Sequence, residues 1–158
     1  MIDVLPDIPA EQQAMVACAL GAAIAYDVPA NILLAIAEQE AGRPGQWVRN
    51  ANGTQDVGAL QFNTAYLREL ARYGISPHDV AAPGCYAYQL AAWRIRGHLR
   101  DDAGDVWARA ANYHSRTPQL NARYRAALIR RAVRWSTWLA THFSTRDIVV
   151  DSPSQVTK

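Results

Sequence analysis

The segment "NILLAIAEQEAGR" (residues 31–43) combines an apolar helical pattern with two glutamates, Glu38 and Glu40. A glycine and a proline follow closely, which is a typical helix stop, so the sequence predicts a helix over residues 30–41. At about 100° per residue, Glu40 falls inside the apolar stripe of this helix, whereas Glu38 falls on the opposite side. We therefore expect Glu40 to face the core or a cleft and Glu38 to face solvent.

An acid in such an apolar wall should hold its proton. Desolvation disfavours the charged form and raises the pKa of a carboxyl group. The last turn of a helix acts in the same direction, since its unpaired carbonyls repel an anion. Both effects favour a protonated Glu40 near neutral pH, as the general acid of a glycosidase or transglycosylase requires. The structural alternative is a buried glutamate paired with one of the chain's fifteen arginines.

The polar stretch after this helix, residues 43–64, is rich in Gly, Asn and Asp and has no helical period. Asn52-Gly53 is a strong hairpin signal. The stretch therefore predicts a small β-hairpin or an extended loop that leads into a short strand over residues 57–62.

The segment "DVGALQFN" (residues 56–63) divides its side chains between two faces. Strand alternation places Gln61 and Asn63 on one face and Leu60 and Phe62 on the other. Amide side chains both donate and accept hydrogen bonds, which suits the recognition of sugar hydroxyl and acetamido groups.

The rest of the chain predicts helices. They are expected over residues 9–26, 65–73 (with Thr64 as N-cap), 84–100, 105–114 and 118–143. The segment "ANYHS" places Tyr113 and His114 at a helix end, where the tyrosine hydroxyl lines a site or the ring simply packs. We expect one mainly α domain of the α+β class over residues 1–143, with a small β excursion after the second helix, and a flexible tail over 144–158.

Composition and charge narrow the function classes. The chain has 158 residues, of which 50% are hydrophobic and 19% are charged, as in soluble globular proteins. No apolar run reaches the roughly 20 residues of a membrane span. No signal-peptide pattern begins the sequence, so we expect either a cytoplasmic protein or one whose export signal was removed.

The charge is unevenly distributed along the sequence. Residues 1–79 carry four Arg and nine Asp or Glu, a net −5, whereas residues 80–158 carry eleven Arg, one Lys and five Asp, a net +7. A basic half can meet nucleic acid, anionic lipid or an acidic polymer, or it can be a solvated helical face. No nucleic-acid-binding motif accompanies it, so we expect no nucleic-acid partner.

The two cysteines, Cys18 and Cys85, lack CxxC spacing and a nearby histidine, so we expect no metal site, and we expect no cofactor. Two alternatives stay open from composition alone. The cysteines are either buried thiols of a cytoplasmic protein or a disulfide formed in an oxidising compartment.

Taken together, "LLAIAEQEAG" (33–42), the Asn/Gly-rich loop, "DVGALQFN" (56–63) and "ANYHS" (111–115) resemble the lytic transglycosylase domain of the lysozyme-like superfamily. The resemblance covers roughly residues 14–128. It is strongest to the small specialised members associated with type III and type IV secretion, conjugation and pilus systems. It implies a lysozyme-like catalytic domain that cleaves the β-1,4 bond between N-acetylmuramic acid and N-acetylglucosamine with formation of a 1,6-anhydro end.

The resemblance also implies residue roles. It assigns the catalytic acid/base to Glu40, and the expected substrate-binding set comprises Asp56, Gly58, Gln61, Asn63, Tyr113 and His114. Among the positions that depart from the family pattern, Ala41 replaces a serine after the glutamate and His114 stands where an asparagine is usual.

The family further implies a disulfide between Cys18 and Cys85, and with it a periplasmic or secreted protein. The expected partners are peptidoglycan glycan strands and secretion, conjugation or pilus apparatus proteins, and we expect a monomer. Two alternatives remain. One is a muramidase that uses Asp56 as second carboxylate in a hydrolysis. The other is a non-catalytic peptidoglycan-binding or secretion-assembly module.

Overall fold

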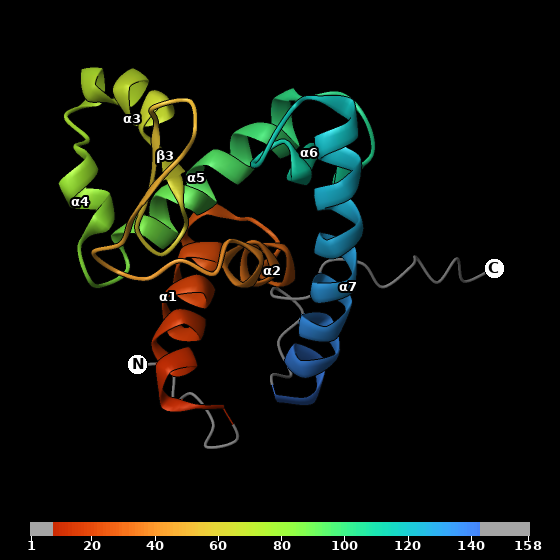
Figure 1. Cartoon of the computed structure of the whole chain (residues 1–158). Coiled ribbons are helices and arrows are strands. Elements are labelled where there is room, and N and C mark those ends of the chain that lie inside the picture. Colours follow the sequence, from red (N-terminus) through yellow and green to blue (C-terminus); the bar gives the residue numbers. More distant parts are fainter. Residues whose placement is uncertain (1–7, 143–158) are drawn as a thin grey trace.

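The computed structural model describes residues 8–142 and has the expected mainly α architecture of the α+β class (Figure 1). The elements are α1 (Ala10–Tyr26), α2 (Ala30–Glu40), β1 (Trp47–Arg49), β2 (Gln55–Val57), β3 (Phe62–Asn63), α3 (Thr64–Leu70), η1 (Ala71–Tyr73), α4 (Pro77–Ala81), α5 (Tyr86–Asp101), α6 (Val106–Ala111) and α7 (Pro118–His142). The predicted tail, residues 144–158, lies outside the described part.

Helix α2 forms the centre of the molecule, packed against α1 and α7 (Figure 1). All of its residues from Ala30 to Ala37 are buried, which explains their nearly continuous apolar sequence. The helix ends at Ala41, which has a left-handed conformation (φ 53°) and donates its N–H to the carbonyl of Ala37. The predicted helix over residues 30–41 is therefore confirmed, and its last turn carries Glu40.

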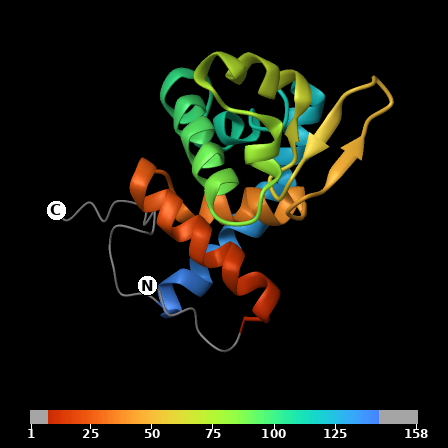
Figure 2. The same ribbon diagram turned by 90° about the vertical axis from the view of Figure 1, so that its left-hand side faces the viewer.

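The polar stretch forms a three-stranded antiparallel sheet in the order β1-β2-β3. Strands β1 and β2 make the predicted hairpin, with Val48 opposite Asp56, and this hairpin projects from the helical body (Figure 2). The turn is held by Asn52, whose side-chain oxygen accepts the N–H of Thr54 at 3.1 Å. Asn52-Gly53 thus serves as the turn that its sequence indicates.

The single strand predicted over residues 57–62 is wrong, because the chain turns between β2 and β3. Gly58 has a positive φ of 73°, and a Cβ there would lie 2.7 Å from the carbonyl oxygen of Val80. Only glycine fits this close approach. The predicted division of faces nevertheless holds, since Leu60 and Phe62 are fully buried whereas Gln61 and Asn63 are partly exposed.

Several helix boundaries differ from the prediction because of capping. Asn63, not Thr64, caps α3 by accepting the N–H of Ala65 at 2.9 Å. The hydroxyl of Thr64 instead accepts the N–H of Gln55 at 3.1 Å, joining α3 to the sheet. The predicted helix over 105–114 ends already at Ala111, so the following segment is free to turn.

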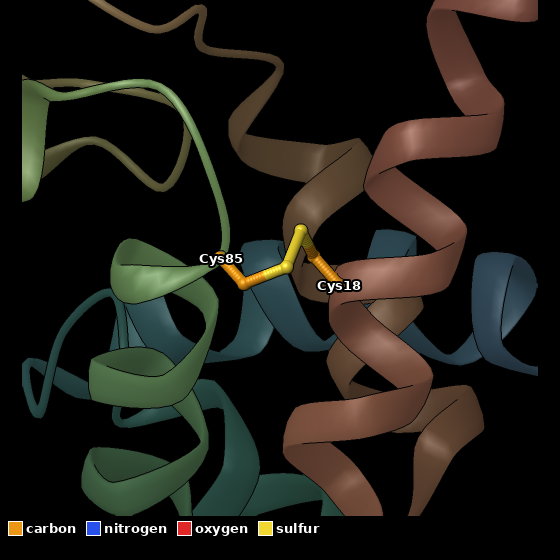
Figure 3. The surroundings of a disulfide bond; sticks show 2 residues. All are labelled: Cys18 and Cys85. Atoms are coloured by element: carbon orange, nitrogen blue, oxygen red, sulfur yellow. A yellow bond between two sulfur atoms is a disulfide. The ribbon is translucent and has the colours of Figure 1, made fainter. Parts of the chain in front are cut away.

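A disulfide joins Cys18 in α1 to Cys85 at the start of α5 (Figure 3). The pairing implied by the family resemblance is therefore confirmed, and the alternative of free thiols is excluded. The bond spans a sequence separation of 67 residues. Closing a loop of this length stabilises the fold by about 4 kcal/mol in the chain-entropy model. In the described part of the chain, no helix combines the length and apolar character needed to cross a membrane.

Candidate active site

Glu40 is the last residue of α2, and α7 supplies its partner. Its Oε1 accepts a hydrogen bond from the hydroxyl of Tyr124 at 2.9 Å. Tyr124 is buried in the interface between the two helices, so its ring is held in place. The other oxygen, Oε2, accepts no hydrogen bond from residues 8–142 and is not among the buried unpaired atoms, so it is open to solvent.

The surroundings of Glu40 favour its protonated form. Burial raises the pKa of this carboxyl to about 7, and the negative charge of Asp56 acts in the same direction. The hydrogen bond from Tyr124 and the positive charge of Arg94 lower the pKa but do not cancel the effect of burial. The predicted rise, and desolvation as its main cause, are confirmed. Both protonation states of Glu40 are therefore accessible near neutral pH.

Close backbone packing ties the end of α2 to the turn between β2 and β3. A Cβ at Gly42 would lie 2.1 Å from the carbonyl oxygen of Gly58 and 2.9 Å from Nε2 of Gln61. The side chain of Gln61 folds back so that its amide donates to the carbonyl of Gly58 at 3.0 Å. Glu40 and the turn are therefore positioned as one unit.

Asn63 and Asp56 bind each other within the sheet. The amide of Asn63 donates to Oδ1 of Asp56 and to the hydroxyl of Thr54, each at 3.0 Å. Because its oxygen also caps α3, the side chain of Asn63 is largely committed to internal contacts. The expected sugar contact of Asn63 stays a prediction. In the structure, Asn63 holds the side chain of Asp56, whose charge acts on Glu40.

Tyr113 lies behind the turn rather than on its surface. It is 3% exposed, and its hydroxyl donates to the carbonyl of Leu60 at 2.9 Å. Its ring packs edge-on against Phe62, with centroids 5.9 Å apart. Burial raises the pKa of the Tyr113 phenol well above its usual value, so it stays protonated as a donor. Its contacts fix the turn; the substrate contact predicted for it is not visible in them.

Two further residues complete the site, Tyr124 and Arg94. The guanidinium of Arg94 lies over the rings of Tyr66 and Tyr113, at 4.0 and 4.6 Å from their centroids. The ring of His114 stacks on that of Tyr124 at 4.7 Å. Sequence reasoning missed Tyr124 and Arg94, because neither residue stands in a local motif. The glutamate pattern indicates only that an inward acid needs partners.

A cleft of about 770 Å³ opens beside these residues. It is bounded by α3, α5 and the segment after α6, and it is linked to Glu40 through Arg94, whose charge acts on that carboxyl, and through His114, which stacks on Tyr124. Deeper in the cleft, Asp102 accepts from His98 at 2.6 Å and pairs with Arg116 at 3.0 Å. Within residues 8–142, no three His, Cys, Asp or Glu side chains group closely enough to hold a metal ion.

The prediction that Glu38 simply faces solvent is wrong. Its side chain is 27% exposed and pairs with Arg131 and with Arg134, the latter at 3.0 Å. The indole N–H of Trp135 donates to its second oxygen at 2.7 Å. Although burial raises the pKa of Glu38, these contacts lower it below its usual value overall. The helix wheel of α2 could not show that α7 runs along this face.

Comparison with known proteins gives distant relatives. The chain is 28% identical over 101 residues to the invasion protein IagB of Salmonella typhimurium. The match covers 63% of this chain and 62% of that protein. It is 29% identical over 93 residues to protein IpgF of Shigella flexneri, covering 58% of this chain and 60% of that protein. The matches thus span less than two thirds of these relatives. No family model matches the chain.

Proposed function

We propose that the chain is a peptidoglycan lytic transglycosylase in which Glu40 acts first as acid and then as base. The observation that carries the proposal is the state of this carboxyl, whose pKa is about 7. One oxygen is held by Tyr124 and the other is open to solvent, and Arg94, whose charge acts on this carboxyl, lines the neighbouring cleft. A pKa near the working pH is what a group needs in order to give and then take a proton.

The reaction uses one carboxyl group. Protonated Oε2 of Glu40 donates its proton to the oxygen of the β-1,4 bond, and the bond to C1 of N-acetylmuramic acid breaks. The resulting carboxylate then accepts the proton of the muramoyl C6 hydroxyl as O6 bonds to C1. The products are a 1,6-anhydro end and a free N-acetylglucosamine hydroxyl, so no water is consumed and Glu40 ends protonated.

Tyr124 orients the acid in this scheme. In the family that the sequence resembles, a serine follows the glutamate, whereas here Ala41 is exposed and carries no hydroxyl. The phenol of Tyr124 donates to Oε1 at 2.9 Å, and this oxygen can accept the hydrogen bond in both protonation states of the carboxyl, because the proton is carried on Oε2. The hydrogen bond therefore fixes the rotation of the carboxyl group and directs Oε2 outward, which supports proton transfer to a bound strand.

Asp56 favours hydrolysis as a second candidate function. It is close enough to Glu40 to raise the pKa of that carboxyl. A glycosidase uses two carboxyl groups, of which the second acts as nucleophile or activates water. In this alternative Asp56 has that second role, and the product carries a reducing end.

The proposed setting is the bacterial cell wall, with glycan strands as substrate. The disulfide supports an oxidising compartment, in which the protein is periplasmic or secreted. Similarity to an invasion protein supports local opening of the wall for a secretion, conjugation or pilus apparatus.

Digestion of purified peptidoglycan, followed by mass spectrometry of the muropeptides, tests the proposal. Products one water lighter than reducing-end muropeptides are expected from the wild type and not from Glu40→Gln. Hydrated products would instead support the hydrolase, and Asp56→Asn should then stop their release. Folded protein that sediments with peptidoglycan but releases nothing would overturn both and identify a binding module.

A further inference from the structure

The exposed face of α5 carries a row of side chains that the reaction does not use. Tyr86, Gln89, Trp93, Arg96 and Arg100 follow one another at intervals of three or four residues and are all exposed. At this spacing they share one face of the helix. The row begins with aromatic side chains and ends with arginines that line the cleft.

A second hollow, the aromatic pocket, lies at the start of this row. Its volume is about 400 Å³, and it is lined by Tyr26, Tyr73, Tyr86, Trp93 and Gln89 together with two aliphatic side chains. Tyr73, Trp93 and Tyr86 are 59%, 43% and 40% exposed, which is unusual for large aromatic groups. No Asp, Glu, Lys or Arg lines the pocket.

The aromatic pocket adjoins the cleft beside Glu40. Trp93 lines both hollows, so its indole is the ridge between them. Along α5, Tyr86 lies roughly 10 Å from Trp93 at 1.5 Å per residue. A linear ligand that lies along the cleft therefore meets Trp93 and then the aromatic pocket.

We propose that the aromatic pocket binds a further, uncharged stretch of the glycan strand, several sugars away from the bond that is cleaved. Aromatic faces carry partial negative charge and attract the C–H groups of a pyranose ring. Phenol and amide groups serve sugar hydroxyl and acetamido groups. The side chains of Tyr26, Tyr73, Tyr86 and Gln89 make no hydrogen bond to another residue between positions 8 and 142. The inference rests on the proposed function for the identity of the strand.

The size and rigidity of the aromatic pocket favour a sugar chain over a protein partner. Seven residues line it, whereas a standard protein interface takes roughly 20–30 residues a side. The disulfide fixes the walls formed by α1 and α5 relative to each other, since Cys85 directly precedes Tyr86 and Cys18 belongs to the helix that ends at Tyr26. A preorganised surface loses little freedom when a strand binds.

Titration of β-1,4-linked N-acetylglucosamine oligomers of increasing length tests the inference, with Glu40→Gln as the background so that nothing is cleaved. Affinity should rise at the length that reaches the aromatic pocket. Tyr73→Ala should remove that rise, weakening long oligomers about 3–10-fold and leaving short ones unchanged. Tyr73 is the sharper probe because Trp93 also lines the cleft.

Two variants serve as controls. Tyr73→Phe keeps the ring and should retain most of the affinity, and Val133→Ala removes an exposed apolar side chain of α7 far along the sequence from the pocket. Thermal unfolding checks that each variant folds. Three outcomes would overturn the inference. Tyr73→Ala could weaken binding equally at all oligomer lengths or not at all, and the alternative occupant of the pocket would then be a protein partner. The Glu40→Gln protein could also bind no oligomer.

The outcomes separate this inference from the proposed function. Length-dependent binding that Tyr73→Ala removes, in a protein that releases no muropeptide, would keep the glycan subsite and discard the enzyme. Cleavage of peptidoglycan to anhydro products, with oligomer binding unaffected by Tyr73→Ala, would keep the enzyme and discard the subsite.

Discussion

Glu38 and Glu40 stand two residues apart on α2, and both are contacted by α7, yet their acidities move in opposite directions. Glu38 meets two guanidinium groups and an indole N–H, and its pKa is lowered. Glu40 meets a neutral phenol and the field of another carboxylate, and its pKa is raised to about 7. Desolvation raises the pKa at both sites and dominates at Glu40, whereas at Glu38 the guanidinium groups and the indole outweigh it.

The comparison shows how one helix can serve two purposes. The part of α7 around Arg131 and Arg134 binds α2 through ion pairs, whereas Tyr124 brings no charge to Glu40 and leaves its pKa near neutral. Stability and reactivity are thus assigned to neighbouring turns of the same helix pair. Four measurements test this division.

The largest expected effect is on turnover. Glu40→Gln removes the group that gives and then takes a proton in the proposed reaction, so release of muropeptides should fall about 10³-fold or more. Glu38→Gln should retain most of the activity, because both oxygens of that carboxyl are bound to side chains of α7. Comparable losses in the two variants would contradict the division of roles.

The second effect is on stability: the same Glu40→Gln variant that loses turnover should gain stability. The raised pKa of Glu40 means that ionisation opposes folding as the pH rises from 4.5 to about 7. Glu40→Gln should therefore increase the free energy of unfolding at pH 8 by roughly 3 kcal/mol and leave it unchanged at pH 4. Chemical denaturation at the two pH values measures this, and a loss of stability at pH 8 would refute the raised pKa.

Tyr124→Phe tests the hydrogen bond that Tyr124 donates to Glu40. The hydrogen bond from Tyr124 lowers the pKa of Glu40, so its removal should raise that pKa and move the alkaline limb of the activity profile up by about one pH unit. Turnover at the optimum should fall about tenfold because the carboxyl is no longer held in line. A limb that stays in place or moves down would contradict the assigned contact. The phenylalanine keeps the ring that stacks on His114.

The smallest expected effect is the loss of stability on replacing Glu38, the ion-paired glutamate. Glu38 has a lowered pKa, so it stabilises the fold above pH 4.5, and this contribution is lost as the pH falls through its folded-state pKa. Glu38→Gln should reduce the free energy of unfolding at pH 7 by about 1 kcal/mol, less at high salt. The difference from wild type should close at acidic pH. A difference that persists below pH 3 would show that packing, not charge, is lost.

Sequence reasoning was accurate where short-range pattern decides the structure. The apolar period of residues 30–41 defined α2 and the inward face of Glu40, and Asn52-Gly53 defined the hairpin. It was wrong over residues 57–62, where alternating side chains resemble a strand but Gly58 allows a turn. Burial alternates in the same way in both, so the pattern alone could not distinguish them.

The partners of the two glutamates could not be predicted, because they depend on docking between distant segments. Tyr124 lies 84 residues from Glu40, and Arg131 lies 93 residues from Glu38. A helix wheel gives the face of a residue but not the helix that will cover it. The cysteine pair was predictable only through family resemblance, since composition allowed both states.

The long separation between Glu40 and Tyr124 also sets an order of events during synthesis. Chains emerge from the ribosome N-terminus first, so α2 exists well before α7 has been made. A nascent chain that stops short of Tyr124 has the acid but not the phenol that orients it, and Glu38 then lacks both of its arginines. Under the proposed function, a chain without α7 would therefore hold an acid that no hydrogen bond orients, and its activity should appear only once α7 has been made and has docked on α2.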